Sequence, residues 1–277
     1  MQFCRMLSHD VEQGILSRKV YFLLALLLSF FACFGLHTQM QDLQRSGLLQ
    51  GKGTFMDYWL YLINGSGPYQ FDIMEFFIVP PRWTGFFLFL LISLNTYPLQ
   101  DLKGWGVQAL VRSKSRWIWW LGKVLWCILY ALVYFIICSF IITVFAVSNG
   151  AAVDLKPSAE VMRCVAREDF ALTTVGKLVC IAMVQPFLLA VFSGLVQMVL
   201  SFILQPIFAF MIVFGMLVAS TYQISYFLPG NWGMAWRMYG IVDSGLKPEI
   251  CICLMAVGIL LCMIVGYYIF RKRDILE

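Results

Sequence analysis

Residues 124–147 read VLWCILYALVYFIICSFIITVFAV, an apolar run without Asp, Glu, Lys, Arg or His. At 1.5 Å per residue, a helix of this length reaches about 36 Å, and the hydrocarbon core of a bilayer is about 30 Å thick. A charged side chain at the bilayer centre costs about 2.5–3.5 kcal/mol, so a run of this length without one is typical of a transmembrane helix. The stretch predicts a membrane protein.

Five further apolar runs extend the same pattern along the chain. We expect six spans in all, at residues 20–36, 83–99, 124–147, 173–200, 202–226 and 250–270, with no ionisable residue in their interiors. Only 13% of the 277 residues are charged, whereas a soluble chain is about a quarter charged. The predicted fold is an all-α membrane protein with one transmembrane domain over residues 1–277, and no separate soluble catalytic domain fits in what remains.

The distribution of Lys and Arg predicts the orientation of the spans. Eleven of the 20 basic residues lie near span ends in residues 1–19, in the loop 100–123 and after residue 270. The other nine lie on the opposite side, in or next to the much longer outer loops 37–82, 148–172 and 227–249. The positive-inside rule therefore predicts a multi-pass protein of the cell membrane with both termini cytoplasmic.

Three shorter segments have patterns of their own. Residues 2–17 place Phe3, Met6, Leu7, Val11, Ile15 and Leu16 at helical spacing, which predicts an amphipathic helix on the membrane surface, or else a frayed tail. The aromatic segment 55–63 is too short to span, and we expect an interfacial or re-entrant helix there. Residues 234–242 suggest another short helix. Pro186 and Pro206 predict kinks in the fourth and fifth spans.

Charge-free spans exclude some functions. Proton-coupled carriers and intramembrane hydrolases keep ionisable groups at depth as relays, ligands or bases, and this chain has none to offer. His9 and His37 are far apart and expected to be solvated, so no metal site is predicted. Cys164, Cys251 and Cys253 leave a disulfide open as a minor alternative to ordinary thiols. We expect no catalytic residue, no cofactor bound by this chain and no nucleic-acid binding.

Some polar side chains do enter the predicted spans. They are Gln185, Ser193 and Gln197 in the fourth span, and Gln205 and Gln223 in the fifth. Amides at such depths usually form hydrogen bonds between helices. The alternative is a polar path that faces a substrate.

The loop 100–123 contains a stretch with helical periodicity. Residues 101–112 place Leu102, Trp105, Gln108, Ala109 and Arg112 three to four positions apart, which predicts a short amphipathic helix close to the membrane. It is either a docking element that fills a groove in a soluble partner or a connector that lies among lipid headgroups.

At this loop the sequence resembles the ABC type-2 permease family, the membrane subunits of many ATP-binding-cassette exporters. The segment 106–116 followed by Gly122-Lys123 is similar to the family's coupling-helix segment, although Val107 and Lys114 replace the usual Thr and Pro. The N-terminal amphipathic helix resembles the family's interfacial helix. Leu228-Pro229-Gly230 resembles its outer re-entrant element before the last span, and residues 268–275 resemble its aromatic and basic tail.

The resemblance implies a permease subunit that is driven by a separate ATPase. It implies two ATPase subunits that bind ATP and Mg²⁺, a second permease subunit of the same or a homologous sequence, and export of an amphipathic peptide, drug or lipid. The implied ATPase-coupling residues are Asp101, Leu102, Trp105, Gln108, Leu110 and Arg112. A membrane enzyme or anchor, and a secondary carrier or channel, are the alternatives.

Overall fold

The computed structural model describes residues 2–67, 79–113, 115–166, 174–239, 241 and 245–272. Within these ranges it describes only the backbone of residues 2–4, 109, 111–113 and 166.

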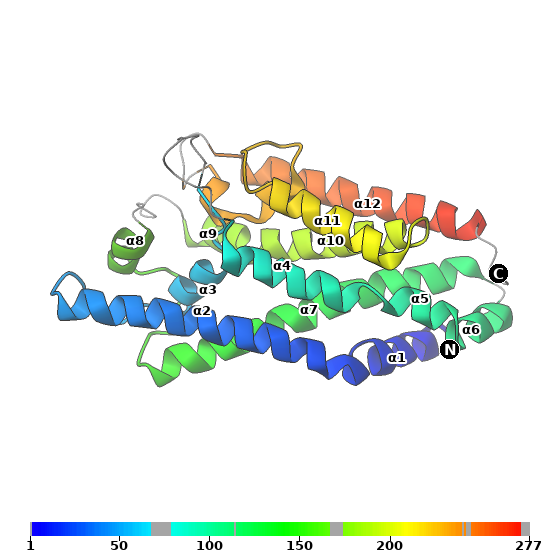
Figure 1. Cartoon of the computed structure of the whole chain (residues 1–277), viewed down its shortest axis with the longest axis horizontal. Coiled ribbons are helices and arrows are strands. Elements are labelled where there is room, and N and C mark those ends of the chain that lie inside the picture. The colour runs from blue at the N-terminus through cyan, green and yellow to red at the C-terminus, as the bar shows by residue number, and fades with distance from the viewer. Residues whose placement is uncertain are drawn as a thin grey trace.

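The described residues form a bundle of helices that run roughly along one long axis (Figure 1). In chain order the helices are α1 (Gln2–Gly14), α2 (Lys19–Arg45), α3 (Phe55–Ile63), α4 (Pro81–Leu94), α5 (Tyr97–Leu102), α6 (Trp105–Ser113), α7 (Arg116–Ser148), α8 (Ala159–Ala166), α9 (Val175–Val179), α10 (Gln185–Ser201), α11 (Pro206–Ala219) and α12 (Pro248–Lys272). A π-helical turn, Cys180–Val184, joins α9 to α10. Both termini lie at the same end of the bundle, beside α1, α5 and α6, and we call this the terminal end (Figure 1).

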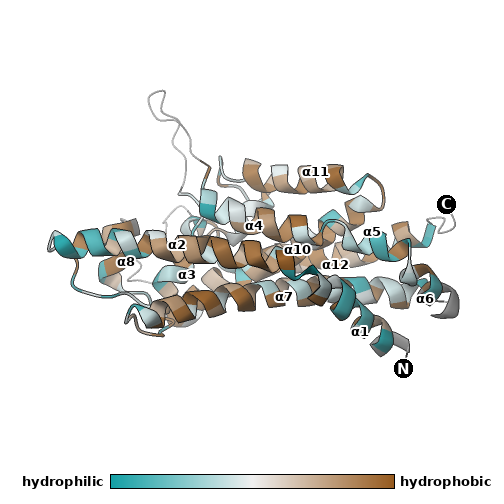
Figure 2. Cartoon of the chain, turned by 60° about the horizontal axis from the view of Figure 1, so that its bottom comes forward, coloured by the Kyte–Doolittle hydropathy of each residue, from teal (hydrophilic) through white to brown (hydrophobic). Residues whose placement is uncertain are grey.

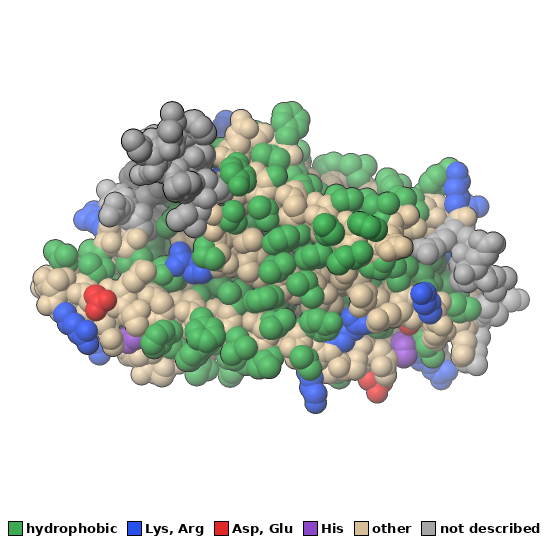
Figure 3. All heavy atoms as spheres, viewed as in Figure 1, with side chains coloured by type: hydrophobic (Ala, Val, Ile, Leu, Met, Phe, Trp, Pro, Cys, Tyr) green, Lys and Arg blue, Asp and Glu red, His purple; other side chains and the backbone are tan. Residues whose placement is uncertain are grey.

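Among the described residues, four helical stretches are long and apolar enough to cross a membrane. They are Arg5–Arg45, Arg116–Ser148, Val175–Ser201 and Pro248–Lys272. Their middle parts are hydrophobic and their ends polar (Figure 2), and hydrophobic side chains cover the middle of the face over α2 and α4 (Figure 3). The prediction of an all-α, multi-pass membrane protein is confirmed at this level.

The first span does not end at residue 36 as predicted. Helix α2 continues to Arg45 through a segment that we assigned to the outer loop. Residues 37–45 are rich in Gln, Leu and Met, which are good helix formers, and buried Met40 holds this extension against the rest of the molecule.

The second and fifth predicted spans are shorter helices than expected. Helix α4 stops at Leu94 because Pro98 has no N–H and its ring would clash with the carbonyl four residues earlier. Helix α11 begins at Pro206, so the predicted kink there is wrong: Gln205 is extended, as residues before proline usually are. Each of α4 and α11 has 14 residues and is therefore about 21 Å long.

Proline has a different effect in the fourth span. Pro186 lies inside a continuous helical stretch, directly after the π-helical turn. The backbone N–H of Gln185 bonds to the carbonyl of Cys180, five residues back, which widens the turn where the proline cannot donate. The short helix predicted at residues 234–242 is wrong, because only Ala235–Arg237 forms a 3₁₀ turn among its described residues.

Helix α3 is confirmed as a helix, and it lies inside the bundle. All nine of its residues are buried, and it packs against α2, α4 and α7. The indole N–H of Trp59 donates to the carbonyl of Ala182 in the π-helical turn, at 2.8 Å.

Asp57 fixes the start of α3. Its Oδ2 accepts hydrogen bonds from the backbone N–H of Thr54, at 2.7 Å, and from the Thr54 hydroxyl, at 3.1 Å. The N–H of Ser158 donates to both carboxylate oxygens, at 3.0 and 3.2 Å. Burial raises the pKa of Asp57 to about 6, against these hydrogen bonds, which lower it.

This pKa predicts a pH-dependent stability. The folded value lies above the ordinary 3.8, so the contribution of Asp57 is largest below about pH 4 and is lost as the pH rises through 6. We expect the stability of the wild type relative to Asp57→Asn, which does not titrate, to fall by up to about 3 kcal/mol over this range. Unfolding in detergent at several pH values measures the difference. A difference that stays constant with pH would contradict the prediction.

Candidate functional site

Three charged side chains meet inside the terminal end of the bundle. Asp10 comes from α1, Asp101 from α5 and Lys123 from the first third of α7. Lys123 Nζ contacts Asp10 Oδ1 and lies 2.8 Å from Asp101 Oδ2. All three side chains are nearly inaccessible to solvent. We call these residues the charge cluster.

Aromatic side chains complete the surroundings of the charge cluster. Tyr97 Oη donates to Asp10 Oδ1 at 2.8 Å, and Trp119 Nε1 donates to Asp101 Oδ2 at 3.1 Å. Lys123 Nζ lies 4.7 Å from the ring centre of Tyr97 and 5.1 Å from that of Trp119. A buried ion pair is stable only when such partners satisfy its remaining groups.

The charge cluster has an excess of negative charge when His9 is neutral, since it combines two carboxylates with one ammonium group. Burial raises the pKa of Asp10, whereas Lys123 and the Tyr97 hydroxyl lower it. Asp10 Oδ2 is buried and has no hydrogen-bond partner among the described residues. His9 Nε2 lies 3.6 Å from Asp101 Oδ1, so a protonated His9 would balance the charge.

His9 also connects the charge cluster to α6. Its ring stacks on that of Trp105, with centres 4.0 Å apart and an angle of 24° between the planes. Trp105 is the first residue of α6. Helix α1 therefore contacts α6 directly through His9 and is joined to α5 and α7 through Asp10.

A pocket of about 380 Å³ opens between α1, α5 and α6. Its lining is mixed polar and aromatic, and consists of His9, Gln13, Ser17, Arg18, Tyr97, Gln100, Asp101 and Trp105. Arg18 spans it by donating to Thr96 Oγ1 at 3.0 Å and to Gln100 Oε1. The pocket thus lies directly beside the charge cluster.

The segment predicted as one coupling helix is broken. Helix α5 ends at Leu102, Lys103 and Gly104 form a turn, and α6 starts at Trp105. Gly106 allows this fold, because a Cβ there would lie 2.5 Å from Asp101 Oδ2 and 2.6 Å from its carbonyl oxygen. Helix α6 can therefore fold back closely over the charge cluster.

The six predicted ATPase-coupling residues differ in their exposure to solvent. Trp105 and Gln108 are exposed on α6, and Leu102 is half-buried. Asp101 and Leu110 are buried, so their side chains lie beneath the exposed face of α6. The side chain of Arg112 lies outside the described residues.

Sequence reasoning missed three members of this site. Asp10 and His9 appeared to be tail residues, and Lys123 a loop cation. His9 is not solvated as predicted, because it lies against Asp101 and Trp105. One signal was present: Asp10 lies between Met6 and Gly14 at intervals of four, on the face of α1 that is buried. This face packs on α7, whereas we expected α1 to lie on the membrane surface.

The polar residues of the fourth span join helices. Gln185 Nε2 donates to the carbonyl of Pro248 at 3.1 Å. Gln197 Nε2 donates to Leu91 O and Asn95 Oδ1, both at 3.0 Å, where α4 ends. Ser193 bonds within its own helix, to Leu189 O at 2.7 Å. These three side chains are buried and line none of the pockets described above or below.

The two polar residues of the fifth span lie outside α11. Gln205 is exposed at its N-cap, and Gln223 is exposed beyond its end. The carbonyl of Gln223 accepts hydrogen bonds from Asn231 Nδ2 at 2.8 Å and from Arg237 Nη1 at 3.1 Å. Neither residue is part of a transmembrane polar path in this structure.

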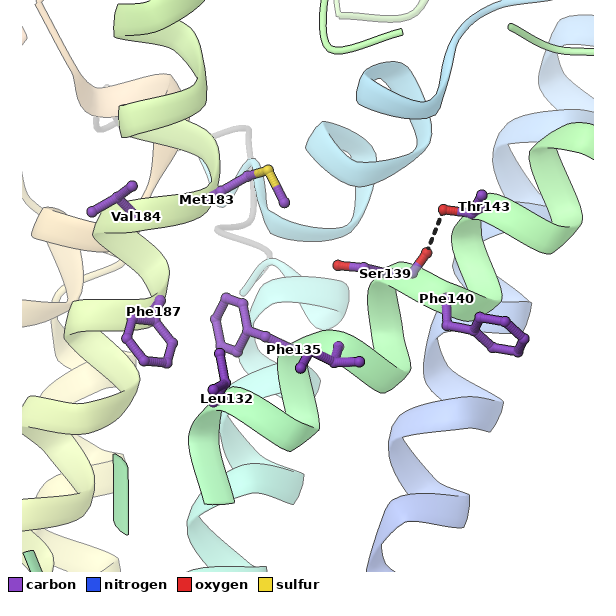
Figure 4. Close-up of a pocket in the computed structure, with 9 residues that line it drawn as sticks. Leu132, Phe135, Ser139, Phe140, Thr143, Met183, Val184 and Phe187 are labelled. Atoms are coloured by element: carbon purple, nitrogen blue, oxygen red, sulfur yellow. Dashed lines mark hydrogen bonds between the residues drawn. The ribbon is translucent and has the colours of Figure 1, made fainter. Parts of the chain in front are cut away.

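A larger pocket of about 490 Å³ lies between α7 and the π-helical turn (Figure 4). Phe135 of α7 and Phe187 of α10 point toward one another across it, with Met183 above them (Figure 4). Its only polar side chains are Ser139 and Thr143, and the Thr143 hydroxyl donates to the Ser139 carbonyl at 2.8 Å. Phe140 on its rim is exposed, so the pocket opens to the outside of the bundle.

The cysteines and the candidate metal ligands can be placed only for the described part of the chain. Cys164, Cys251 and Cys253 are free thiols. No group of three His, Cys, Asp or Glu among the described residues has metal-binding geometry.

Comparison with known proteins places the chain at family level. No curated protein and no solved structure matches it, and no ABC permease family matches either. A family model described as "Protein of unknown function (DUF2705)" matches residues 48–276, which include α3 to α12 and the Asp101 and Lys123 members of the charge cluster. The chain belongs to this family of proteins of unknown function.

Proposed function

We propose that this chain is the membrane subunit of an ATP-driven exporter of the ABC type-2 kind. In this proposal its partner is a soluble ATPase that holds ATP and Mg²⁺ and docks on α6 from the cytoplasm. The terminal end is then the cytoplasmic end. The proposal agrees with the absence of ionisable residues from the interiors of the apolar runs, because an energy source outside the chain is then needed.

One observation carries the proposal: α6 rests on the charge cluster. A load on Trp105 passes to His9 and α1 by ring stacking. It passes to α5 through the contact of Gly106 with Asp101, and to α7 through Lys123. Buried charge pairs of this kind resist separation, because an uncompensated buried charge is costly. The three helices would thus move as one unit when a partner pushes on α6.

The proposed topology has six crossings. Helices α4 and α5 together cover residues 81–102 and follow one another along the bundle (Figure 1), so they form the second crossing. Helix α11 and the compact segment after it form the fifth. An even number of crossings agrees with the position of both termini at one end (Figure 1).

The proposed transporter contains a second permease subunit, of the same or a homologous sequence, and two ATPase subunits. Its cargo is an amphipathic peptide, drug or lipid. The apolar lining of the pocket between α7 and the π-helical turn supports this cargo class, since a strongly polar solute would find no partners there.

Trp105→Ala tests the docking surface. The substitution removes the exposed ring on α6 and its stacking with His9, so we expect a loss of about tenfold in ATPase affinity, which is about 1.4 kcal/mol. The matched control is Phe227→Ala, which removes an exposed ring outside α6, in the loop before the last helix. Co-purification from native membranes with the ATPase, and ATP-dependent uptake into inverted vesicles, measure the effect.

Three outcomes would overturn the proposal. The first is a native preparation that contains no ATP-binding-cassette subunit. The second is uptake that proceeds without ATP, which would indicate a secondary carrier. The third is an equal effect of Trp105→Ala and Phe227→Ala on ATPase binding.

A further inference from the structure

A small groove lies on the bundle surface between the middle of α2 and the start of α4, away from the charge cluster. It has a volume of about 240 Å³. Helix α2 supplies one wall, α3 the floor and the start of α4 the head; the lining residues are Leu28, Phe31, Ala32, Gly35, Tyr61, Pro81 and Arg82. Apart from the Arg82 guanidinium and the Tyr61 hydroxyl, the side chains that line the groove are apolar.

Arg82 is a cation at the head of this apolar groove. Its guanidinium carbon lies 3.5 Å from the ring centre of Tyr61, so the planar group is held against the aromatic face. Burial lowers the pKa of Arg82. Among the described residues no carboxylate lies within ion-pair distance of it. Its charge is therefore held in place without an anionic partner from these residues.

Arg237, which is fully buried, gives a comparison for Arg82 within the same molecule. The Arg237 donors are all directed at protein oxygens, including the carbonyls of Ser66 and Gln223. Arg82, by contrast, is half-buried and borders a pocket. Only Arg82 of the two is placed to meet a ligand.

The groove lies beside the border between apolar and polar sequence on α2 and α4. Gly35 is next to Leu36, the last residue of an apolar run that polar residues follow, and Arg82 directly precedes the apolar run that begins at Trp83. From Arg82 the groove descends along Leu28 and Phe31 into the apolar part of α2. Arginine at such a boundary keeps its charged head at the interface and its stem in apolar surroundings.

We propose that Arg82 and this groove bind a phospholipid from the leaflet opposite the charge cluster. The phosphate accepts hydrogen bonds from the guanidinium, whose two terminal nitrogens match a phosphate in a bidentate manner. One acyl chain lies along Leu28, Phe31 and Gly35. The amino terminus of α4, which begins at Pro81, adds a favourable dipole for the phosphate. This inference depends on membrane residence and not on ATP-driven export.

Native mass spectrometry of the full chain, titrated with phosphatidylglycerol in detergent, tests the proposal. We expect Arg82→Gln to weaken retention of the most tightly held lipid about tenfold. Arg82→Lys keeps the charge but loses the planar fork and the stacking on Tyr61, so we expect an intermediate loss. The matched control is Arg45→Gln, which removes the same charge from a highly exposed arginine on α2 and should leave retention unchanged.

A second variant tests the acyl chain. A Cβ on Gly35 would be 3.7 Å from the Tyr61 hydroxyl, an ordinary contact, so Gly35→Leu fills the groove without a backbone clash. We expect it to weaken lipid retention with no change of charge, at an unfolding temperature close to that of the wild type. Equal retention by Arg82→Gln and the wild type would overturn the proposal. Equal losses in Arg82→Gln and Arg45→Gln, or displacement of the lipid by inorganic phosphate, would also overturn it.

Discussion

Replacing Lys123 by methionine is expected to destabilise the protein by about 3–5 kcal/mol. Methionine has a similar volume, so packing is largely kept, but Asp10 and Asp101 lose their shared cation inside the bundle. Removing one partner from a buried ion pair leaves an uncompensated buried charge, which costs far more than the pair contributes. Unfolding in detergent, followed by tryptophan fluorescence, measures the loss. Lys103→Met, on the exposed turn before α6, is the control and should change little.

The pH dependence of this loss has a definite sign. Without Lys123, burial raises the pKa of Asp10 with less opposition, so the carboxyl takes up a proton more readily in the folded state. The deficit of Lys123→Met should therefore shrink as the pH falls and be largest at neutral pH.

A double variant separates the ion pair from simple packing. The double variant Asp10→Asn with Lys123→Met removes one carboxylate together with the ammonium group. Its loss of stability should therefore be smaller than the sum of the losses in the two single variants. If Lys123→Met costs under about 1 kcal/mol, or if the double variant is strictly additive, the buried ion pair does not hold α1 to α7.

Replacing Arg237 by methionine has the second largest expected effect, at least about 3 kcal/mol. The guanidinium is fully buried, and its five N–H groups lie within hydrogen-bond distance of seven oxygen atoms, so some are shared between two acceptors. Its acceptors are the carbonyls of Ser66, Gly67, Ser220, Thr221 and Gln223, the Ser66 hydroxyl and the Asn231 side-chain oxygen. Each buried acceptor left unpaired costs about 1–3 kcal/mol.

Arg237 joins the segment after α3 to the segment after α11. It also lies near the carboxyl end of α11, where a cation is favourable. Burial lowers its pKa to about 10, so the group stays charged at neutral pH. Arg237→Lys retains charge but has only three donors and should recover part of the stability.

Limited proteolysis locates the effect of Arg237→Met. We expect earlier cleavage in the segment 220–237, together with a lower unfolding temperature of the whole chain. Exposed Arg45 provides the control, because Arg45→Met breaks only a surface pair with Asp42. Unchanged cleavage and an unchanged unfolding temperature in Arg237→Met would contradict this role.

The long helices could be predicted from the sequence because helical periodicity and the length of an apolar run depend only on neighbouring residues. Helix α12 corresponds closely to the predicted span 250–270, whereas α7 contains the predicted span 124–147 and begins eight residues before it. A local rule also explains why α4 is short: in a continued helix the ring of Pro98 would clash with the carbonyl of Leu94. The predicted span 83–99 rested on hydropathy and did not take this proline into account.

The charge cluster could not be predicted in the same way. Asp10 and Lys123 are separated by 113 positions, and each reads alone as a solvated charge beside a span. Arg237 likewise reads as a loop cation, although its surroundings come from segments that are about 170 and 15 residues away. Whether such a residue is solvated or buried depends on which segments the fold brings together.

By itself, then, the apolar run 124–147 and its counterparts determined that this is an all-α membrane protein whose long helices bury their backbone polar groups in hydrogen bonds. Only the tertiary structure decided which charges are buried and paired: Lys123 between two carboxylates, and Arg237 among carbonyls. The physical reason is that helix formation and hydrophobicity act over a few neighbouring residues, whereas the stability of a buried charge depends on partners from distant parts of the chain.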